Sequence, residues 1–153
     1  MAEKINSFYI PGTKNVRPEL LNEFAEKIAK SFALISPNPK NPRSPFRDGV
    51  TSTQVRRLFD EVKRYERIIK DDDQKSWNEQ YPYIKMMKSK VHYTVARAKK
   101  RANSITQKCY DNLSDFISEG IDLIKDANDY HVFVSLFEAV YGFYYENRPD
   151  IKN

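Results

Sequence analysis

The feature that most limits the fold is the spacing of apolar residues, which follows the period of an α-helix in five segments. One of these segments begins at Pro82, and its apolar residues are three or four positions apart: Ile84, Met87, Val91, Val95, Ala98 and Ala102. No segment alternates with a period of two for long enough to be a strand. We therefore expect an all-α protein, a compact bundle of four to five helices.

Proline and capping residues indicate where these helices begin and end. The expected helices cover residues 18–33, 51–69, 82–102, 105–125 and 129–146. Pro18 and Pro82 each suit the first turn of a helix, which does not need their missing N–H. Thr51 and Gln54 have the spacing of a capping box, and Asp129 is the expected cap of the last helix.

The 153 residues are enough for one domain with its own core, flanked by less regular segments. Residues 1–17 have no periodicity and are expected to form a flexible N-terminal arm. Residues 18–50 contain helix 1 and a proline-rich linker, Ser36–Gly49, whose four prolines predict a mobile, non-helical segment. Residues 51–146 form the helical bundle core, and 147–153 form a C-terminal tail.

Charge is unevenly distributed along the chain, whose net charge is +5. The stretch Gln80–Ala102 has seven Lys or Arg residues and no acid. Residues 103–129, in contrast, carry a net charge of −4. A basic segment of this kind indicates an anionic partner, and nucleic acid is the partner that it suits best.

A helical wheel of the third helix separates its apolar stripe from a basic face. That face contains Lys90, Tyr93, Arg97, Lys100 and Arg101. The cations can neutralise phosphates, and the ring between them can stack on an unpaired base. The alternative is a solvated lysine-rich face on which the tyrosine touches a neighbouring helix.

The preceding helix carries a second basic stripe, formed by Arg56, Lys63 and Arg67. These residues are also candidate RNA contacts. Asp60 lies four residues after Arg56, however, and other acids follow on the same helix. Ion pairs within the helix can therefore offset much of this charge.

The residues that usually carry enzyme chemistry do not form a recognisable pattern. The two histidines are 39 residues apart, and the four glycines form no phosphate-binding loop. The single cysteine, Cys109, is expected to be a buried small hydrophobe. Glu138, beside the apolar stripe of the last helix, is expected to form a buried structural ion pair or hydrogen bond. We therefore expect no catalytic activity, no metal site and no cofactor.

The chain also shows no sign of a membrane segment. No apolar run approaches the roughly 20 residues that a spanning helix needs, and the N-terminus lacks the apolar stretch of a signal peptide. We expect a soluble, cytoplasmic protein.

Four segments, in this order, resemble the small helical subunit of type III-A CRISPR effectors, the Csm complexes. They are TSTQVRRLF (51–59), IKMMKSKVHYTVAR (84–97), LSDFISEGI (113–121) and FVSLFEAVYGFYYE (133–146). Arg56 matches the arginine that follows the cap in that family, and Tyr93 and Arg97 match its Tyr-x-x-x-Arg pattern. The arm and the proline-rich linker are outside the resemblance and inherit no role.

The resemblance implies a non-catalytic scaffold subunit. Several copies would lie beside the duplex of crRNA and target RNA and hold the target by its backbone, while other subunits cut. The implied partners are target RNA, the crRNA-containing Csm complex, other Csm subunits and other copies of the chain. The linker also permits a homodimer of the isolated protein, with helix 1 docked on a second copy. The alternative is a stand-alone helical nucleic-acid-binding or protein-interaction adaptor domain.

Overall fold

The computed structural model describes residues 4–69 and 73–151, and it confirms the mainly helical bundle. In chain order its elements are a short 3-10 helix η1 (Pro18–Leu21), α1 (Glu23–Lys30), β1 (Ala33–Ser36), β2 (Phe46–Gly49), α2 (Ser52–Ile68), α3 (Gln74–Lys99), α4 (Ser104–Leu123) and α5 (Ala127–Glu146). None of the helices in the part of the chain described here is long and apolar enough to cross a membrane.

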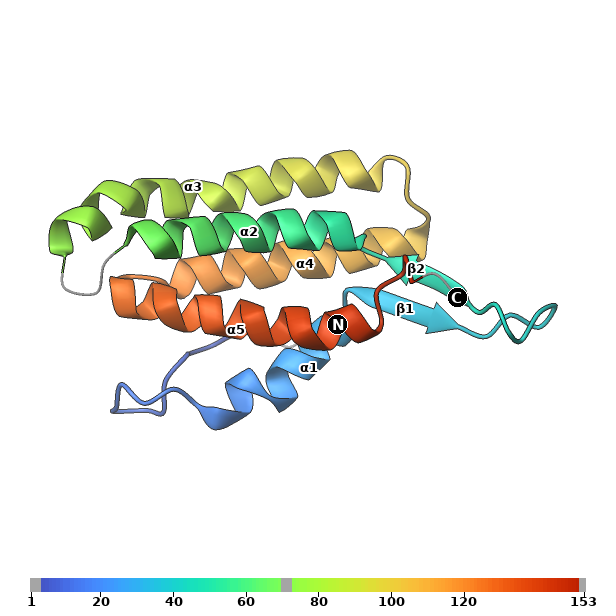
Figure 1. Ribbon diagram of the computed structural model, residues 1–153, viewed down its shortest axis with the longest axis horizontal. Coiled ribbons are helices and arrows are strands. Elements are labelled where there is room, and N and C mark those ends of the chain that lie inside the picture. The colour runs from blue at the N-terminus through green and yellow to red at the C-terminus, as the bar shows by residue number, and fades with distance from the viewer. Residues whose placement is uncertain (1–3, 70–72, 152–153) are drawn as a thin grey trace.

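Four long helices, α2 to α5, lie side by side along the long axis of the molecule, and the two strands project from one end (Figure 1). Helix α3 packs on α4, while α2 and α1 both pack on α5. Helix 1 therefore lies on the bundle of its own chain.

The apolar stripe predicted for the third helix is the face that α3 buries. Ile84, Met87, Val91 and Val95 are all at most 5% exposed. The rest of the core is rich in aromatic residues, and the hydroxyls of buried Tyr130 and Tyr144 donate to backbone carbonyls. Tyr130 donates to the carbonyl of Val62 at 2.7 Å, for example. Such pairing removes most of the cost of burying a polar group.

A two-stranded antiparallel sheet corrects the expectation of a chain without strands. Ala33 pairs with Gly49 and Ser36 with Phe46, so the prolines of the expected linker lie in the loop between the strands. Strands of four residues are too short to show an alternating pattern in the sequence. Gly49 adopts φ 141°, and a Cβ there would come within 2.5 Å of the Phe32 carbonyl oxygen, so this position needs glycine.

Helix α3 begins at Gln74, eight residues before the predicted start at Pro82. The carboxylate of Asp73 caps it by accepting hydrogen bonds from the N–H groups of Lys75 and Ser76. The early turns are held by Trp77, which is 3% exposed. The cap and this burial outweigh the cost of a proline inside the helix.

The sequence predicted a flexible arm at the N-terminus and Asp129 as the cap of the last helix, and the structure adds to the first and corrects the second. Residues 4–17 are not helical, yet Ile5 and Phe8 are buried in the core. Asp126, not Asp129, caps α5. Asp129 lies inside the first turn, where its buried carboxylate accepts hydrogen bonds from the Tyr9 hydroxyl at 2.6 Å and from the Lys125 N–H at 2.9 Å. The segment 4–17 is therefore tied to α5.

Candidate nucleic-acid interface

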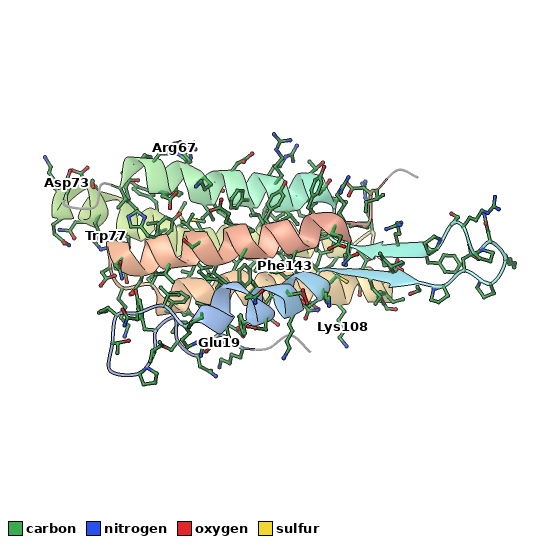
Figure 2. All side chains as sticks on the ribbon, turned by 60° about the horizontal axis from the view of Figure 1, so that its bottom comes forward. Glu19, Arg67, Asp73, Trp77, Lys108 and Phe143 are labelled. Carbon is green, nitrogen blue, oxygen red and sulfur yellow. The ribbon has the colours of Figure 1, made fainter. Side chains whose placement is uncertain are left out.

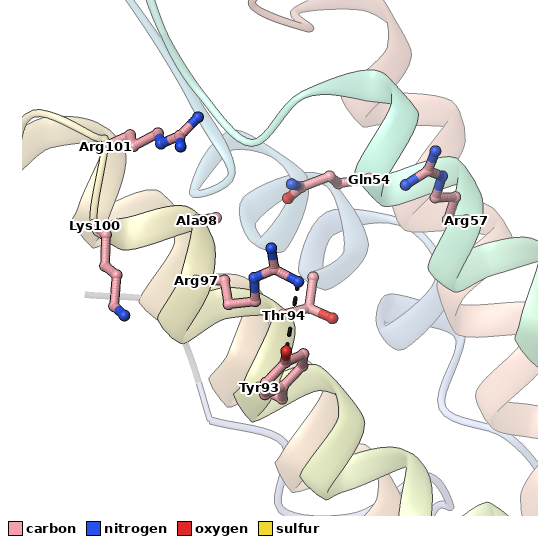
Figure 3. A pocket seen from close by; sticks show the side chains of 8 residues that line it. All are labelled: Gln54, Arg57, Tyr93, Thr94, Arg97, Ala98, Lys100 and Arg101. Atoms are coloured by element: carbon pink, nitrogen blue, oxygen red, sulfur yellow. Dashed lines mark hydrogen bonds between the residues drawn. The ribbon is translucent and has the colours of Figure 1, made fainter.

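A basic hollow with a volume of about 590 Å³ lies between the first turns of α2 and the last turns of α3 (Figure 3). We call it the α2–α3 hollow. Its lining residues are Gln54 and Arg57 from α2 and Tyr93, Thr94, Arg97, Ala98, Lys100 and Arg101 from the end of α3.

The α3 residues reach this hollow because the core stripe fixes the rotation of the helix. Val91 and Val95 face the core, and each residue two positions further on is turned by about 200°, toward the outside. Tyr93 is accordingly 64% exposed. Figure 3 shows the guanidinium of Arg97 projecting into the space between α3 and α2.

Tyr93 and Arg97 form a pair one helical turn apart. The Arg97 guanidinium lies 5.7 Å from the centre of the Tyr93 ring, and its Nη1 donates to the Tyr93 hydroxyl at 3.4 Å. The hydroxyl that accepts from Arg97 is neutral, so the guanidinium keeps its positive charge. A phosphate can still approach the guanidinium, and part of the ring stays open for stacking.

The α2–α3 hollow carries positive charge without nearby compensation. Its lining contains no carboxylate. In residues 4–69 and 73–151, none of Arg57, Arg97, Lys100 and Arg101 forms an ion pair with an acid. Four cations around one hollow repel one another, and a polyanion would relieve that repulsion.

Four of the residues predicted from the sequence meet at this hollow: Tyr93, Arg97, Lys100 and Arg101. Lys90 belongs to the same helix, but it does not line the hollow. Its ammonium forms a 3.0 Å ion pair with Glu61 of α2. The absence of acids near Lys90 in the sequence therefore did not mean that its charge was unpaired.

Arg56, Lys63 and Arg67 do not join this hollow, because they project from other sides of α2. Arg56 lies 3.9 Å from Asp60, and Lys63 pairs with Glu66 at 2.9 Å. The hydrogen bond to Glu66 raises the pKa of the Lys63 ammonium. Arg67 is exposed at the outer surface of the helix (Figure 2).

Sequence reasoning missed both α2 residues of the hollow, Gln54 and Arg57, as well as Thr94 and Ala98 of α3. Arg56 and Arg57 follow the cap together, and their side chains diverge by about 100° around the helix. The buried stripe of α2 shows that both face away from the core. It does not show on which side α3 lies, and α3 is what makes Arg57 part of the hollow.

The structure corrects the burial expected for Glu138. This side chain is exposed on α5. Its charge acts at a distance instead, since it adds to the effect of Glu66 in raising the pKa of Lys63.

Cys109 is buried, as expected, and burial raises the pKa of its thiol. In the described ranges, no three His, Cys, Asp or Glu side chains are placed so that they could hold a metal ion.

Comparison with known proteins gives one result. The family model described as Csm2 Type III-A matches residues 15–146, which is most of the chain and includes every helix of the bundle. No significant match was found among curated proteins or among solved structures.

Proposed function

Because the chain belongs to the Csm2 Type III-A family, and is therefore a subunit of a type III-A CRISPR complex, we propose that it is a non-catalytic scaffold that holds target RNA. The α2–α3 hollow would receive the RNA backbone. The resemblance seen in the sequence and the family match agree on the complex, so we favour this role over a stand-alone adaptor domain.

The observation that carries the proposal is the group of unpaired cations around an exposed ring. Arg57, Arg97, Lys100 and Arg101 can each neutralise a phosphate, and Tyr93 can stack on a base. Cations that contact phosphates carry no sequence information. Such a subunit would bind any target, while pairing with the guide reads the sequence.

The composition of the hollow also supports binding over catalysis. Its lining has no histidine, cysteine or carboxylate, which are the usual general bases and metal ligands. We therefore assign cleavage of RNA to other subunits of the complex.

The proposed partners are target RNA, crRNA within the complex, other Csm subunits and further copies of this chain in the cytoplasm. A homodimer of the isolated protein through helix 1 is a separate proposal. It meets competition from the packing of α1 on α5 within the chain, where Phe24, Ala25 and Ile28 are buried. A monomeric mass over a wide range of protein concentrations would argue against it.

Assembly with the other subunits provides a direct test. The complex should be purified from cells that express either the natural chain or the double variant Arg57→Ala, Arg97→Ala, and target RNA should be cross-linked to it. We expect both complexes to contain the subunit, and the variant to cross-link less to the target. Equal cross-linking by the two would count against the α2–α3 hollow as the RNA site.

A further inference from the structure

We propose that single-stranded RNA continues from the α2–α3 hollow over the first turns of α2 to a second contact surface beside the C-terminal tail. This inference rests on the proposed function, because it extends the same RNA-binding surface. The second surface is a hollow of about 210 Å³, which we call the tail hollow. Its lining residues are Ser52, Thr53, Arg56, Tyr141, Tyr145 and Arg148.

The tail hollow combines an aromatic ring with cations, as the α2–α3 hollow does. Tyr145 is 53% exposed, although it follows a fully buried residue near the end of α5. The guanidinium of Arg148 lies 3.8 Å from the centre of the Tyr145 ring. It is held there by a 2.6 Å hydrogen bond from its Nη1 to the Tyr145 carbonyl. Ring and guanidinium together offer flat surfaces on which a base can stack.

The charge of the tail hollow is positive at its lining and partly offset at its edge. Arg56 and Arg148 are the charged residues of the lining. Arg56 is 74% exposed, and its ion pair with Asp60 is long, at 3.9 Å. An exposed pair of this length contributes little and can be exchanged for a phosphate.

A carboxylate already lies beside the tail hollow. Asp150 of the C-terminal tail accepts hydrogen bonds from the Ser52 N–H, at 3.3 Å, and from the Ser52 hydroxyl. The lining groups of this hollow thus hold an anion of the chain itself. A phosphate of RNA would compete with this carboxylate, so we infer that Asp150 weakens RNA binding in the isolated protein.

The two hollows are neighbours on the surface of α2. Arg57 lines one and Arg56 lines the other, and consecutive side chains on a helix diverge by about 100°. Thr53, one turn earlier, lies between the directions of these two arginines. A strand that crosses the first two turns of α2 can therefore contact both hollows, and it would pass Asp60, which pairs with Arg56, and Asp150, which accepts from Ser52.

Comparing a short with a long RNA distinguishes the contribution of the tail hollow from that of the α2–α3 hollow, because only the long RNA can reach both. Fluorescence anisotropy should measure the affinity of the full chain for oligouridylates of about 4 and about 15 nucleotides, lengths near the limits of known single-strand sites. The variants are Tyr145→Ala, Arg148→Ala, Asp150→Asn and, in the first hollow, Arg97→Ala. Lys108→Ala is the matched control, since this exposed cation lies on α4 and lines neither hollow.

We expect Tyr145→Ala to weaken binding of the long oligonucleotide about 5-fold to 150-fold, the loss that one stacked base accounts for. Arg148→Ala should make the logarithmic salt slope for binding of the long oligonucleotide shallower by about 0.7. Asp150→Asn should strengthen binding of the long oligonucleotide. Of the four variants, only Arg97→Ala should change the affinity for the short oligonucleotide. Lys108→Ala should change neither affinity.

Two outcomes would overturn the inference, and they have different meanings. If Arg97→Ala weakens binding but Tyr145→Ala and Arg148→Ala leave the long oligonucleotide unaffected, the tail hollow does not bind RNA and the α2–α3 hollow stands. If none of these variants alters the binding of either oligonucleotide, the proposed function fails as well. Because Tyr145 and Arg148 are not in the core, melting curves of these variants should match that of the natural chain.

Discussion

Replacing Arg97 by alanine tests whether the basic face of α3 binds RNA or is only solvated. If all four unpaired cations of the α2–α3 hollow neutralise phosphates, binding of single-stranded RNA should fall with salt at a logarithmic slope of about −2.8, from roughly 0.7 per phosphate. Arg97→Ala removes one contact, so the slope should become shallower by about 0.7. The fold should persist, because Arg97 is exposed.

Two companion variants show what kind of contact is lost. Tyr93→Ala should weaken binding by about 1–3 kcal/mol with little change in slope, since stacking releases no counterions. Lys90→Ala should weaken binding less than Arg97→Ala, because Glu61 already offsets the charge of Lys90. Lys125→Ala, an exposed cation that follows α4, should have no effect.

Affinity should be measured by fluorescence anisotropy over a range of salt concentrations, and stability by thermal unfolding of each variant. The reasoning would be refuted if Arg97→Ala destabilised the fold by about 2–5 kcal/mol, as a core truncation does, and left affinity unchanged. The basic face would then be structural. A salt dependence that is flat for the natural chain would also contradict backbone binding.

Two further predictions concern stability. Gly120→Ala should destabilise the protein by about 1–3 kcal/mol, because the new Cβ would lie 2.2 Å from the buried Phe133 ring. Gly142→Ala, in open space on α5, should instead stabilise it by up to about 1 kcal/mol, and thermal unfolding that ranks the two variants the other way would contradict this packing. Burial raises the pKa of Tyr130 and Tyr144, so the fold favours their neutral forms. The free energy of unfolding should be constant below about pH 10 as far as these tyrosines are concerned, and above it should fall by about 1.4 kcal/mol per pH unit for each tyrosine. Urea unfolding between about pH 8 and 11 would detect this loss. Equal stability across that range would count against it.

Several features of this fold depend on neighbouring residues in the chain, and the sequence was sufficient to predict them. The buried stripe of α3 follows from helical geometry alone, so Val91 and Val95 could be assigned to the core and Tyr93 and Arg97 to the surface. The cap of α2 is equally local, since Thr51 accepts from the Gln54 N–H three residues away. The order of the four resembling segments indicated the family that the comparison then confirmed.

The sequence did not predict features in which local signals compete with distant contacts. Pro82 is a strong local reason to begin a helix, but burial of Trp77 against the bundle extends α3 to Gln74. Strands β1 and β2 stabilise each other through hydrogen bonds across nine intervening residues, and neither has an alternating pattern of its own.

The chain itself determined which residues are exposed and basic, and tertiary packing decided which of them share a site. The amino-acid order of α2 turns Arg56 and Arg57 outward, but only the place of α3 beside α2 puts Arg57 near Arg97. That same packing pairs Lys90 with Glu61, 29 residues away. The physical reason is that a helix period specifies directions around one axis, whereas a binding hollow and an ion pair depend on the position of a second helix.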